Sequence, residues 1–357
     1  MSAKHDRGGK RMKYKKIVLA GGNGYLGKML ANYYRDKADE IIILSRHEKQ
    51  TEQNIRTVVW DGKSTGRWTA ELVNADMLVN LCGKNVNCRY TEKNKAEIIA
   101  SRVLPTELLG LVIHELFEPP KLWINVTSAT IYRHAEDRPQ DEETGEIGSG
   151  FSVDVCRAWE AAFNKYDTPK TRKITLRMGI VLGRDDSVFP RLLTLVKLGM
   201  GGKQGDGQQY VSWVHEHDVA RSTEWFIEHP DAQGIFNCTA PIAVKNEDLM
   251  HIIRKVYDRL LGLPAPVWLL KVGAMVIGTE TELILKSRWV TPARLLQSGF
   301  KFQFEKAEDA VRDLLNSTAK RTQWCTSSLC LQIQRSNNGP LDDFDPGRPG
   351  KSDRRDN

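Results

Sequence analysis

The stretch from Lys16 to Gly27 limits the fold more than any other part of this sequence. Its apolar run, Ile17 to Ala20, predicts a buried parallel strand. A glycine-rich turn follows, with Gly21, Gly24 and Gly27. The residues after it predict a helix whose apolar face is formed by Leu26, Met29, Leu30, Tyr33 and Tyr34. Such a turn lets a pyrophosphate approach bare backbone, where the N–H groups and dipole of the helix hold the anion.

The next apolar run, Ile41 to Leu44, lies at the distance expected of a strand–helix–strand unit. This context favours a dinucleotide site over an ordinary glycine-rich turn. The run ends in Ser45-Arg46, where NAD-selective domains place an acidic residue for the ribose 2′-hydroxyl, whereas an arginine suits a 2′-phosphate. The sequence therefore predicts NADP(H) as the cofactor; the alternative is that Arg46 is a solvated residue at a strand end.

Charge is distributed unevenly along the 357 residues, whose formal net charge is +7. Residues 1–16 carry a net charge of +6 and residues 320–357 one of +2, which leaves −1 for the body of the chain. A near-neutral body gives no support for nucleic-acid binding. The basic arm, residues 1–14, is expected to be a disordered solubilising end, with RNA or an acidic membrane as the alternative contact.

Six scattered cysteines, without Cys-x-x-Cys pairs, indicate a reducing compartment and argue against structural zinc. The N-terminus lacks the apolar segment of a secretory signal. The most apolar late stretch, 267–277, contains Lys271 and is too short to span a bilayer. We therefore expect a cytoplasmic protein with no metal site and no membrane contact.

Strand-like and helical segments alternate through the first half of the chain. Strands are predicted at 57–61, 75–81, 122–126 and 173–177, and helices at 91–117 and 153–166. This alternation predicts an α/β fold, a doubly wound parallel Rossmann sheet with a smaller C-terminal α/β region on the substrate side. The expected domains are an NADP-binding Rossmann domain at 15–235, with a substrate-side loop at 190–212, and a substrate-side region at 236–318. A disordered tail at 319–357 completes the chain.

Ligands of such sheets bind outside the carboxyl ends of the strands. The site should therefore involve the glycine turn, Cys82-Gly83, Ser128 and the polar loop 133–150, which has the composition of a lid. Asp218 is predicted to be the N-cap of the helix that follows Trp213-Val-His215.

At this point the sequence resembles an extended short-chain dehydrogenase/reductase (SDR), from about Lys16 to Leu315. The residues that carry the resemblance are the glycine spacing, Asp61, Leu81-Cys82-Gly83, Ser128-Ala-Thr-Ile-Tyr132 and Trp213-Val-His215. More closely it is similar to the atypical branch named epimerase family protein. The features of that branch are Trp159-Glu160, Arg177-Met-Gly-Ile-Val-Leu-Gly183, the loop from Gly201 to Gln208, and a C-terminal module at 264–316 with Val290-Thr-Pro292 and Gly299-Phe-Lys-Phe302.

The resemblance implies a set of cofactor-binding residues, namely Gly21, Asn23, Gly24, Tyr25, Leu26, Gly27, Ser45, Arg46, Asp61, Leu81, Cys82, Gly83, Glu97, Arg102 and Glu160. Arg102 would lie near the cofactor phosphates and Glu160 near a ribose. A solvated helix-face pair is the alternative for Glu97 and Arg102. For Cys82 the alternatives are an oxidisable thiol and a small buried residue.

The departure from the family concerns catalysis. Typical members use a serine or threonine with Tyr-x-x-x-Lys, in which the tyrosine transfers a proton and the lysine lowers its pKa. When the family pattern is aligned on Glu160, Ser152 falls at the tyrosine position and Cys156 at the lysine position. A serine hydroxyl is not a usable proton donor near neutrality, and a cysteine cannot supply the fixed positive charge of the lysine. The resemblance therefore supports cofactor binding more strongly than the usual mechanism.

Ser128 is the candidate catalytic residue, with a structural strand-end hydroxyl as the alternative. Tyr132, Trp213 and His215 are candidates for the substrate pocket, although each also suits a framework role. The sequence predicts an NADP(H)-dependent oxidoreductase or epimerase-like enzyme acting on an unidentified small polar substrate. The alternative is a non-catalytic NADP(H)-binding redox sensor or scaffold; the substrate, reaction direction and oligomeric state stay open.

Overall fold

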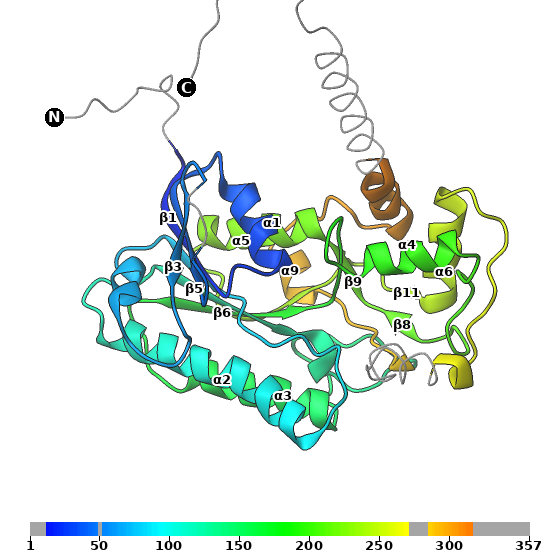
Figure 1. Cartoon of the computed structure of the whole chain (residues 1–357), viewed down its shortest axis with the longest axis horizontal. Coiled ribbons are helices and arrows are strands. Elements are labelled where there is room, and N and C mark those ends of the chain that lie inside the picture. Colours follow the sequence, from blue (N-terminus) through cyan, green and yellow to red (C-terminus); the bar gives the residue numbers. More distant parts are fainter. Residues whose placement is uncertain (1–11, 49–51, 271–284, 317–357) are drawn as a thin grey trace, which may run out of the picture. The chain divides into compact units, whose positions relative to one another are not determined.

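A computed structural model describes residues 12–48, 52–270 and 285–316, of which those up to Leu314 belong to one compact unit (Figure 1). Most of the basic arm and the whole tail at 319–357 lie outside the described residues. In the described ranges, no helix has both the length and the apolar character needed to cross a membrane.

Seven parallel strands form the central sheet. Their spatial order is β3 (Ile55–Val59), β2 (Ala38–Ser45), β1 (Tyr14–Ala20), β4 (Met77–Asn80), β5 (Leu122–Ser128), β6 (Arg172–Met178) and β10 (Gly234–Cys238). The chain builds outward from β1 in one direction and then, from β4, in the other. This order confirms the predicted doubly wound sheet and places its switch point at the carboxyl ends of β1 and β4.

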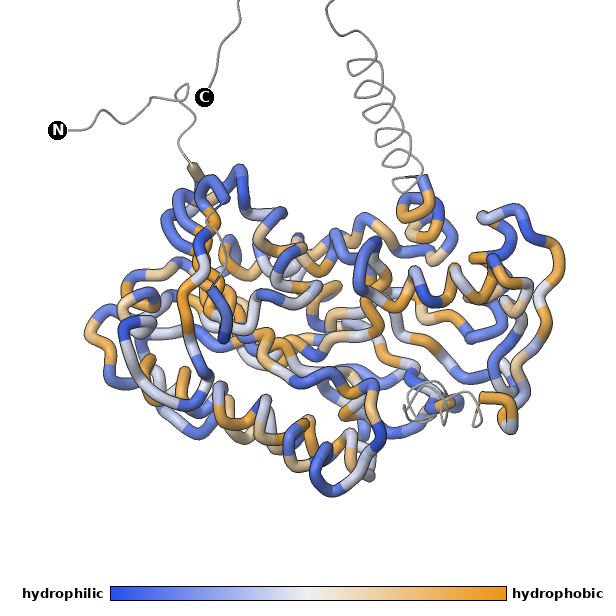
Figure 2. The backbone as a smooth tube through the Cα atoms, in the orientation of Figure 1, coloured by the Kyte–Doolittle hydropathy of each residue, from blue (hydrophilic) through white to orange (hydrophobic). Residues whose placement is uncertain are grey.

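Helices cover both faces of the sheet (Figure 1). One face carries α1 (Tyr25–Tyr34) and α5 (Glu216–Glu228); the other carries α2 (Glu92–Glu115), α3 (Phe151–Asn164) and the short helix η1 (Arg67–Leu72). Each helix contributes apolar residues to a core on its own face, such as Leu30 of α1 and Ile113 of α2. Figure 2 shows the matching pattern, with hydrophobic colours along the strands.

Smaller elements lie beyond the carboxyl ends of the central strands. They are β7 (Ile180–Leu182) paired with β9 (Trp213–His215), β8 (Tyr210–Val211) paired with β11 (Val244–Lys245), α4 (Phe189–Lys197), α6 (Asn246–Val256) and a helical segment at 307–316. The short helix α9 (Ala293–Gln297) lies instead at the start of β10, where Arg294 donates to the carbonyls of Gln233 and Ile235. The sequence missed β10, and the expected domain boundary at 235/236 falls inside this strand. Since β10 pairs with β6, the sheet continues past that boundary.

The predicted N-cap of α5 was wrong. His215 is the cap, and its side chain accepts a hydrogen bond from the backbone N–H of His217. Asp218 is instead fully buried and accepts hydrogen bonds from the N–H groups of Gln303 and Phe304, at 2.8 and 2.9 Å. A buried carboxylate needs such donors, and here they come from the C-terminal region.

The loop 133–150 is held against the C-terminal region by hydrogen bonds. Gln140 N–H donates to the carbonyl of Trp289 (2.7 Å), and Thr291 N–H donates to the carbonyl of Gln140 (2.9 Å). The Glu142 carboxylate accepts from Asn237 N–H of β10 at 2.7 Å and from Arg294 N–H of α9 at 3.3 Å. The loop is therefore tied to both the last strand and the C-terminal region.

Candidate functional site: a glycine turn and two pockets at the strand ends

The turn between β1 and α1 is built from glycines with different constraints. Gly21 has φ +72°, in the left-handed region, and its N–H donates to the carbonyl of Leu44. A Cβ on Gly27 would lie 2.1 Å from the carbonyl oxygen of Gly22, so only glycine lets α1 pack this closely. A Cβ on Gly24 would meet nothing within 4 Å. The turn therefore has no space for a side chain at Gly27, where α1 packs, and has free space at Gly24.

The start of α1 suits an anion. Gly24 is the N-cap, no side chain caps the free N–H groups, and the first turn holds no acidic residue. Unpaired N–H groups at a helix N-terminus bind phosphate through hydrogen bonds and the helix dipole. These features and the open space at Gly24 fit the diphosphate of a dinucleotide.

The residues expected around the adenosine half lie at the ends of β2 and β3. The Asn23 amide donates to the Ser45 hydroxyl, which joins the glycine turn to β2. Arg46 is exposed, and no described residue forms an ion pair with its guanidinium. Asp61 is also exposed; its carboxylate accepts from the N–H groups of Lys63 and Ser64, and these bonds lower its pKa to about 2.

Leu81, Cys82 and Gly83 follow β4 and run beside the glycine turn. Leu81 N–H donates to the carbonyl of Ala20 at 2.9 Å. The Cys82 sulfur would lie 2.9 Å from a Cβ on Gly21, and burial raises the pKa of this thiol to about 12. A thiol with so high a pKa is protonated and unreactive near neutrality. Gly83 adjoins the Arg102 guanidinium, whose carbon would lie 3.0 Å from a Cβ on Gly83.

Tyr25, the first residue of α1, points its phenol to the end of β7. The phenol donates to the Glu216 carboxylate and leaves no room for a side chain at Gly183. Glu216 also accepts from the Arg184 guanidinium at 2.5 Å, and burial beside this carboxylate raises the pKa of the phenol. Leu26, in the same helical turn, packs against the core. Tyr25 thus ties the glycine turn to the segment after β7.

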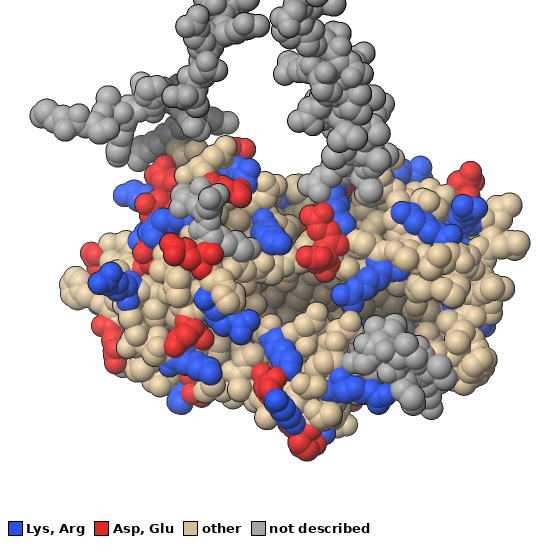
Figure 3. All heavy atoms as spheres, viewed as in Figure 1, with Lys and Arg blue, Asp and Glu red and all other residues tan. Residues whose placement is uncertain are grey.

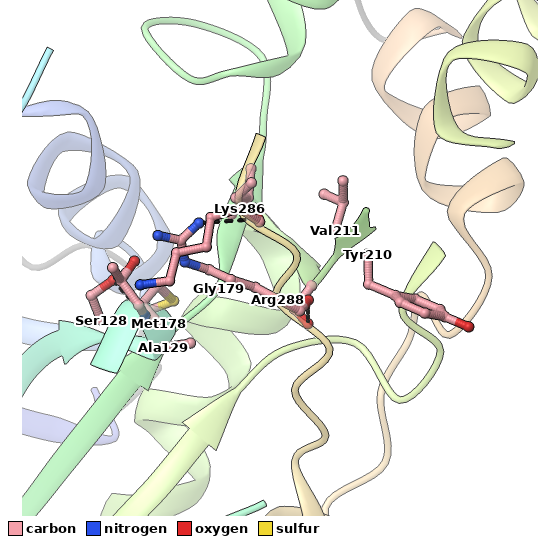
Figure 4. A pocket seen from close by; sticks show the side chains of 11 residues that line it. Ser128, Ala129, Met178, Gly179, Tyr210, Val211, Lys286 and Arg288 are labelled. Atoms are coloured by element: carbon pink, nitrogen blue, oxygen red, sulfur yellow. Dashed lines mark hydrogen bonds between the residues drawn. The ribbon is translucent and has the colours of Figure 1, made fainter. Parts of the chain in front are cut away.

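Two pockets meet at Ser128, at the carboxyl end of β5. The first, about 90 Å³, is lined by Ser128, Ala129, Thr130, Met178, Gly179, Ile180, Tyr210, Val211, Ser212, Lys286 and Arg288. The second, about 130 Å³, is lined by Val86, Tyr90, Ile98, Arg102, Ser128, Thr130, Phe151, Ser152, Val155, Cys156 and Trp159. Figure 4 shows the nitrogens of Lys286 and Arg288 on the Ser128 side of the first pocket, whereas Tyr210 points away.

Ser128 also caps the short helix η2 (Ala129–Ile131). Its hydroxyl accepts from Thr130 N–H at 3.2 Å and lies 2.9 Å from the Thr130 hydroxyl. The Cys156 thiol donates to the Ser128 carbonyl at 3.8 Å, and burial raises the pKa of this thiol to about 11. Ser128, Ser152 and Cys156 all line the second pocket.

Glu160 and Tyr132 belong to a buried polar cluster around Arg177. Both oxygens of the Glu160 carboxylate accept from the Arg177 guanidinium at 2.8 Å. Arg177 also donates to the Tyr132 phenol at 2.9 Å, and the phenol donates to Asn237 at 3.1 Å. Neither Glu160 nor Tyr132 lines either pocket. These contacts suit a framework role for both residues.

Trp213, His215 and Glu97 lie away from the two pockets. Trp213 is fully buried and donates to the carbonyl of Ile242, and His215 is buried against Phe304. Glu97 is exposed on α2, paired with Lys84 at 2.5 Å, and this ion pair lowers the pKa of its carboxyl. The structure thus brings together the glycine turn, Cys82-Gly83, Arg102 and Ser128. Trp213, His215 and Glu97 do not belong to this group.

The burial of His215 gives a pH prediction. Burial lowers the pKa of its imidazole from 6.5 to about 3, so the unfolded chain binds more protons between these values and stability falls as the pH falls. We expect wild type to lose about 2 kcal/mol more unfolding free energy than His215→Asn between pH 7 and pH 5. Asn keeps a capping acceptor but does not titrate. Urea denaturation at both pH values tests this, and equal losses would contradict it.

Sequence reasoning missed Lys286, Arg288, Tyr210 and the pair Tyr90–Phe151. Lys286 and Arg288 lie just before Val290-Thr-Pro292. The sequence signal that could have identified them is a basic pair two residues apart in the C-terminal module. The aromatic pair could not have been identified in this way, since Tyr90 and Phe151 meet only through the tertiary fold, with ring centroids 4.8 Å apart.

The comparisons with known proteins agree with this architecture. The model of the NAD dependent epimerase/dehydratase family matches residues 17–239, and that of a domain of unknown function, DUF1731, matches residues 265–314. Epimerase family protein YfhF of Bacillus subtilis is 29% identical over 300 residues, covering 84% of this chain and 97% of that protein. Epimerase family protein ML0860 of Mycobacterium leprae is 30% identical over 298 residues, covering 83% of this chain and 94% of that protein.

The crystal structure of the human epimerase family protein SDR39U1 (isoform 2) with NADPH is also similar. It superimposes with a TM-score of 0.74 at 26% identity and covers 84% of this chain and 98% of that one. The family match spans the glycine turn, the strand ends and both serines of the second pocket, so the cofactor class is a nicotinamide nucleotide. The chain belongs to the NAD dependent epimerase/dehydratase family, among the relatives named epimerase family proteins.

Proposed function

We propose that this protein binds NADP(H) across the glycine turn and acts as an oxidoreductase or epimerase-like enzyme on a small polar substrate. The observation that carries the proposal is the position of Ser128. Its hydroxyl lies where two pockets meet, at the same edge of the sheet as the glycine turn and Cys82-Gly83. The bound cofactor would supply hydride transfer, and Ser128 would orient a hydroxyl or carbonyl oxygen of the substrate.

The cations of the first pocket support an anionic substrate. Lys286 and Arg288 both line this pocket and lie on its Ser128 side. Such a lining suits a phosphate-bearing molecule, of which a sugar nucleotide is one example. Figure 3 shows a face of the molecule hollowed near its middle, with Lys and Arg on both sides of the hollow.

The preference for NADP(H) depends on Arg46, and the human relative with NADPH supports it. Arg46→Ala is expected to weaken NADPH binding by about 10- to 100-fold, a loss of about 1.4–2.7 kcal/mol, and to leave NADH binding unchanged. Fluorescence titration with both coenzymes measures this. Lys170→Ala, at the opposite edge of the sheet, is the control. An equal loss for NADPH and NADH would remove Arg46 from the specificity site.

The rival proposal is a non-catalytic NADP(H) binder that acts as a sensor or scaffold. The residues of α3 favour it, because Ser152 and Cys156 stand where the family resemblance implies tyrosine and lysine. A neutral Cys156 thiol cannot supply the fixed cation of that pair. We also propose a cytoplasmic location, which the free thiols at Cys82, Cys88, Cys156 and Cys238 support.

Turnover distinguishes the two proposals. Purified protein with NADPH would be offered carbonyl compounds and sugar nucleotides while NADPH fluorescence is followed. Turnover that falls about 100-fold in Ser128→Ala, but not in Thr194→Ala on the exposed face of α4, supports the enzyme. NADPH binding without turnover across the panel supports the sensor. Absence of NADPH and NADH binding would reject both.

A further inference from the structure

Ser287 separates the two cations of the first pocket in the chain. Lys286 and Arg288 line this pocket, with their nitrogens on its Ser128 side (Figure 4). Ser287 itself is fully buried and lines neither pocket. Serine is mostly found at protein surfaces, and its hydroxyl is hydrogen-bonded when it is buried. The partners of Ser287 therefore show how the backbone between the two cations is held.

Every hydrogen-bonding group of Ser287 has a partner. Its hydroxyl donates to the carbonyl of Ala135 at 2.7 Å and accepts from the N–H of Tyr210 at 2.9 Å. Its own N–H donates to Nδ1 of the His134 imidazole at 3.1 Å, and its carbonyl accepts from the N–H of Ala135 at 3.3 Å. This one residue thus joins the loop 133–150, β8 and the C-terminal module.

The backbone on the C-terminal side of Ser287 is fixed as well. The N–H of Arg288 donates to the carbonyl of Tyr210 at 2.9 Å, and its guanidinium donates to the carbonyl of Lys286 at 3.3 Å. The Ser212 hydroxyl donates to the carbonyl of Arg288 at 2.7 Å and accepts from the N–H of Val290 at 2.7 Å. The segment that carries both cations is therefore held by β8 and by its neighbour Ser212.

We propose that Ser287 is a positioning residue for the substrate, which holds the backbone so that Lys286 and Arg288 bind the same anionic group. Long cationic side chains have several rotatable bonds, so they converge on one anion only where the backbone beneath them is fixed. A hydroxyl suits this role because it donates and accepts at once. Ser287 acts through its two neighbours. The inference rests on the proposed function, since these two cations are the ones assigned there to an anionic substrate.

The test needs no knowledge of the substrate, since inorganic phosphate serves as the probe. Equilibrium dialysis of the full chain with radiolabelled phosphate measures the Kd of the folded protein. Phosphate can also bind at the glycine turn. The binding that Lys286→Met/Arg288→Met retains is therefore subtracted as the baseline. Ser287→Ala is expected to weaken the remaining, pocket-specific phosphate binding by about 10-fold, because both cations are displaced.

Ser222→Ala is the matched control. Ser222 is also fully buried, and its hydroxyl donates to the carbonyl of Val219 at 2.8 Å within α5. It lines neither pocket. Both serine variants should lower the Tm by about 2–4 °C, since each removes a buried hydrogen bond. Only Ser287→Ala should change the phosphate Kd, because a purely structural role lowers the Tm and leaves the affinity of the folded protein unchanged.

The three variants separate the possible failures. Wild-type phosphate affinity in Ser287→Ala, together with a loss in Lys286→Met/Arg288→Met, would overturn the positioning role and leave the anionic substrate in place. Phosphate binding of wild-type strength in Lys286→Met/Arg288→Met would show that the two cations form no anion site, and would overturn both. A loss of affinity in Ser222→Ala equal to that in Ser287→Ala would assign the effect to general destabilisation and overturn the positioning role.

NADPH titration of the same preparations tests the proposed function separately. Ser287→Ala should bind NADPH within twofold of wild type, and a larger loss would place Ser287 in the cofactor site and overturn the inference. If wild type binds no NADPH, the proposed function fails, whereas the phosphate measurement still decides whether Ser287 positions the two cations.

Discussion

Glu160→Ala is expected to lower the free energy of unfolding by about 3–5 kcal/mol, the largest effect that we predict for a single substitution. The Glu160 and Arg177 side chains are 13% and 7% exposed, and both carboxylate oxygens are bonded to the guanidinium. Removing the carboxylate leaves the Arg177 charge buried without its partner. Urea denaturation, with the midpoint and slope fitted together, measures the loss.

Two further variants decide whether this loss reflects the ion pair. Replacing both partners in Glu160→Met/Arg177→Met should recover most of the stability, since a buried pair is often matched by apolar residues of similar volume. Lys165→Met breaks an exposed ion pair with Glu107 of α2, on the same face of the sheet. It should change the free energy of unfolding by less than about 1 kcal/mol. A Glu160→Ala protein of normal stability that no longer binds NADPH would reverse our interpretation and make Glu160 a cofactor ligand.

Alanine substitutions in the glycine turn should separate folding from cofactor binding. Gly27→Ala places a Cβ 2.1 Å from a carbonyl oxygen, so α1 must move away from β1, and we expect about 1–3 kcal/mol of destabilisation. Gly24→Ala meets no protein atom within 4 Å and has φ −75°, which any residue adopts, so its stability should stay within about 0.5 kcal/mol of wild type.

The two variants should nevertheless both lose NADPH affinity. In Gly24→Ala the added methyl group occupies the space above the turn, where the diphosphate would approach, and we expect a loss on the order of 100-fold, about 2.7 kcal/mol. Fluorescence titration and thermal unfolding of the same preparations give both readouts. Gly24→Ala binding NADPH as tightly as wild type would show that the diphosphate does not pass over this glycine.

Local patterns in the sequence predicted the sheet and the glycine turn because both are encoded by short-range signals. The apolar run before Gly21 and the periodicity of α1 are visible over a few residues, and right-handed crossovers then restrict the topology. The strand β10 escaped prediction because its sequence, Gly-Ile-Phe-Asn-Cys, is short, contains a glycine and a buried polar residue, and has no strong period.

The candidate site was only partly predictable, since its polar groups are assigned by long-range contacts. Glu160 has the same sequence environment whether its carboxylate meets a ribose or Arg177, which is 17 residues away. Likewise, Asp218 has the residue type of an N-cap, but two N–H groups from 85 and 86 residues further along the chain occupy its carboxylate. Tertiary partners of this kind override local propensity.

The bonds that Asp218 accepts from Gln303 and Phe304 also bear on how this chain can be shortened. A chain cut before residue 285 would keep every strand of the central sheet, yet the Asp218 carboxylate would lose both backbone donors and retain its bond from the Arg221 guanidinium. The matched segment 265–314 is therefore no detachable appendage of an autonomous Rossmann domain.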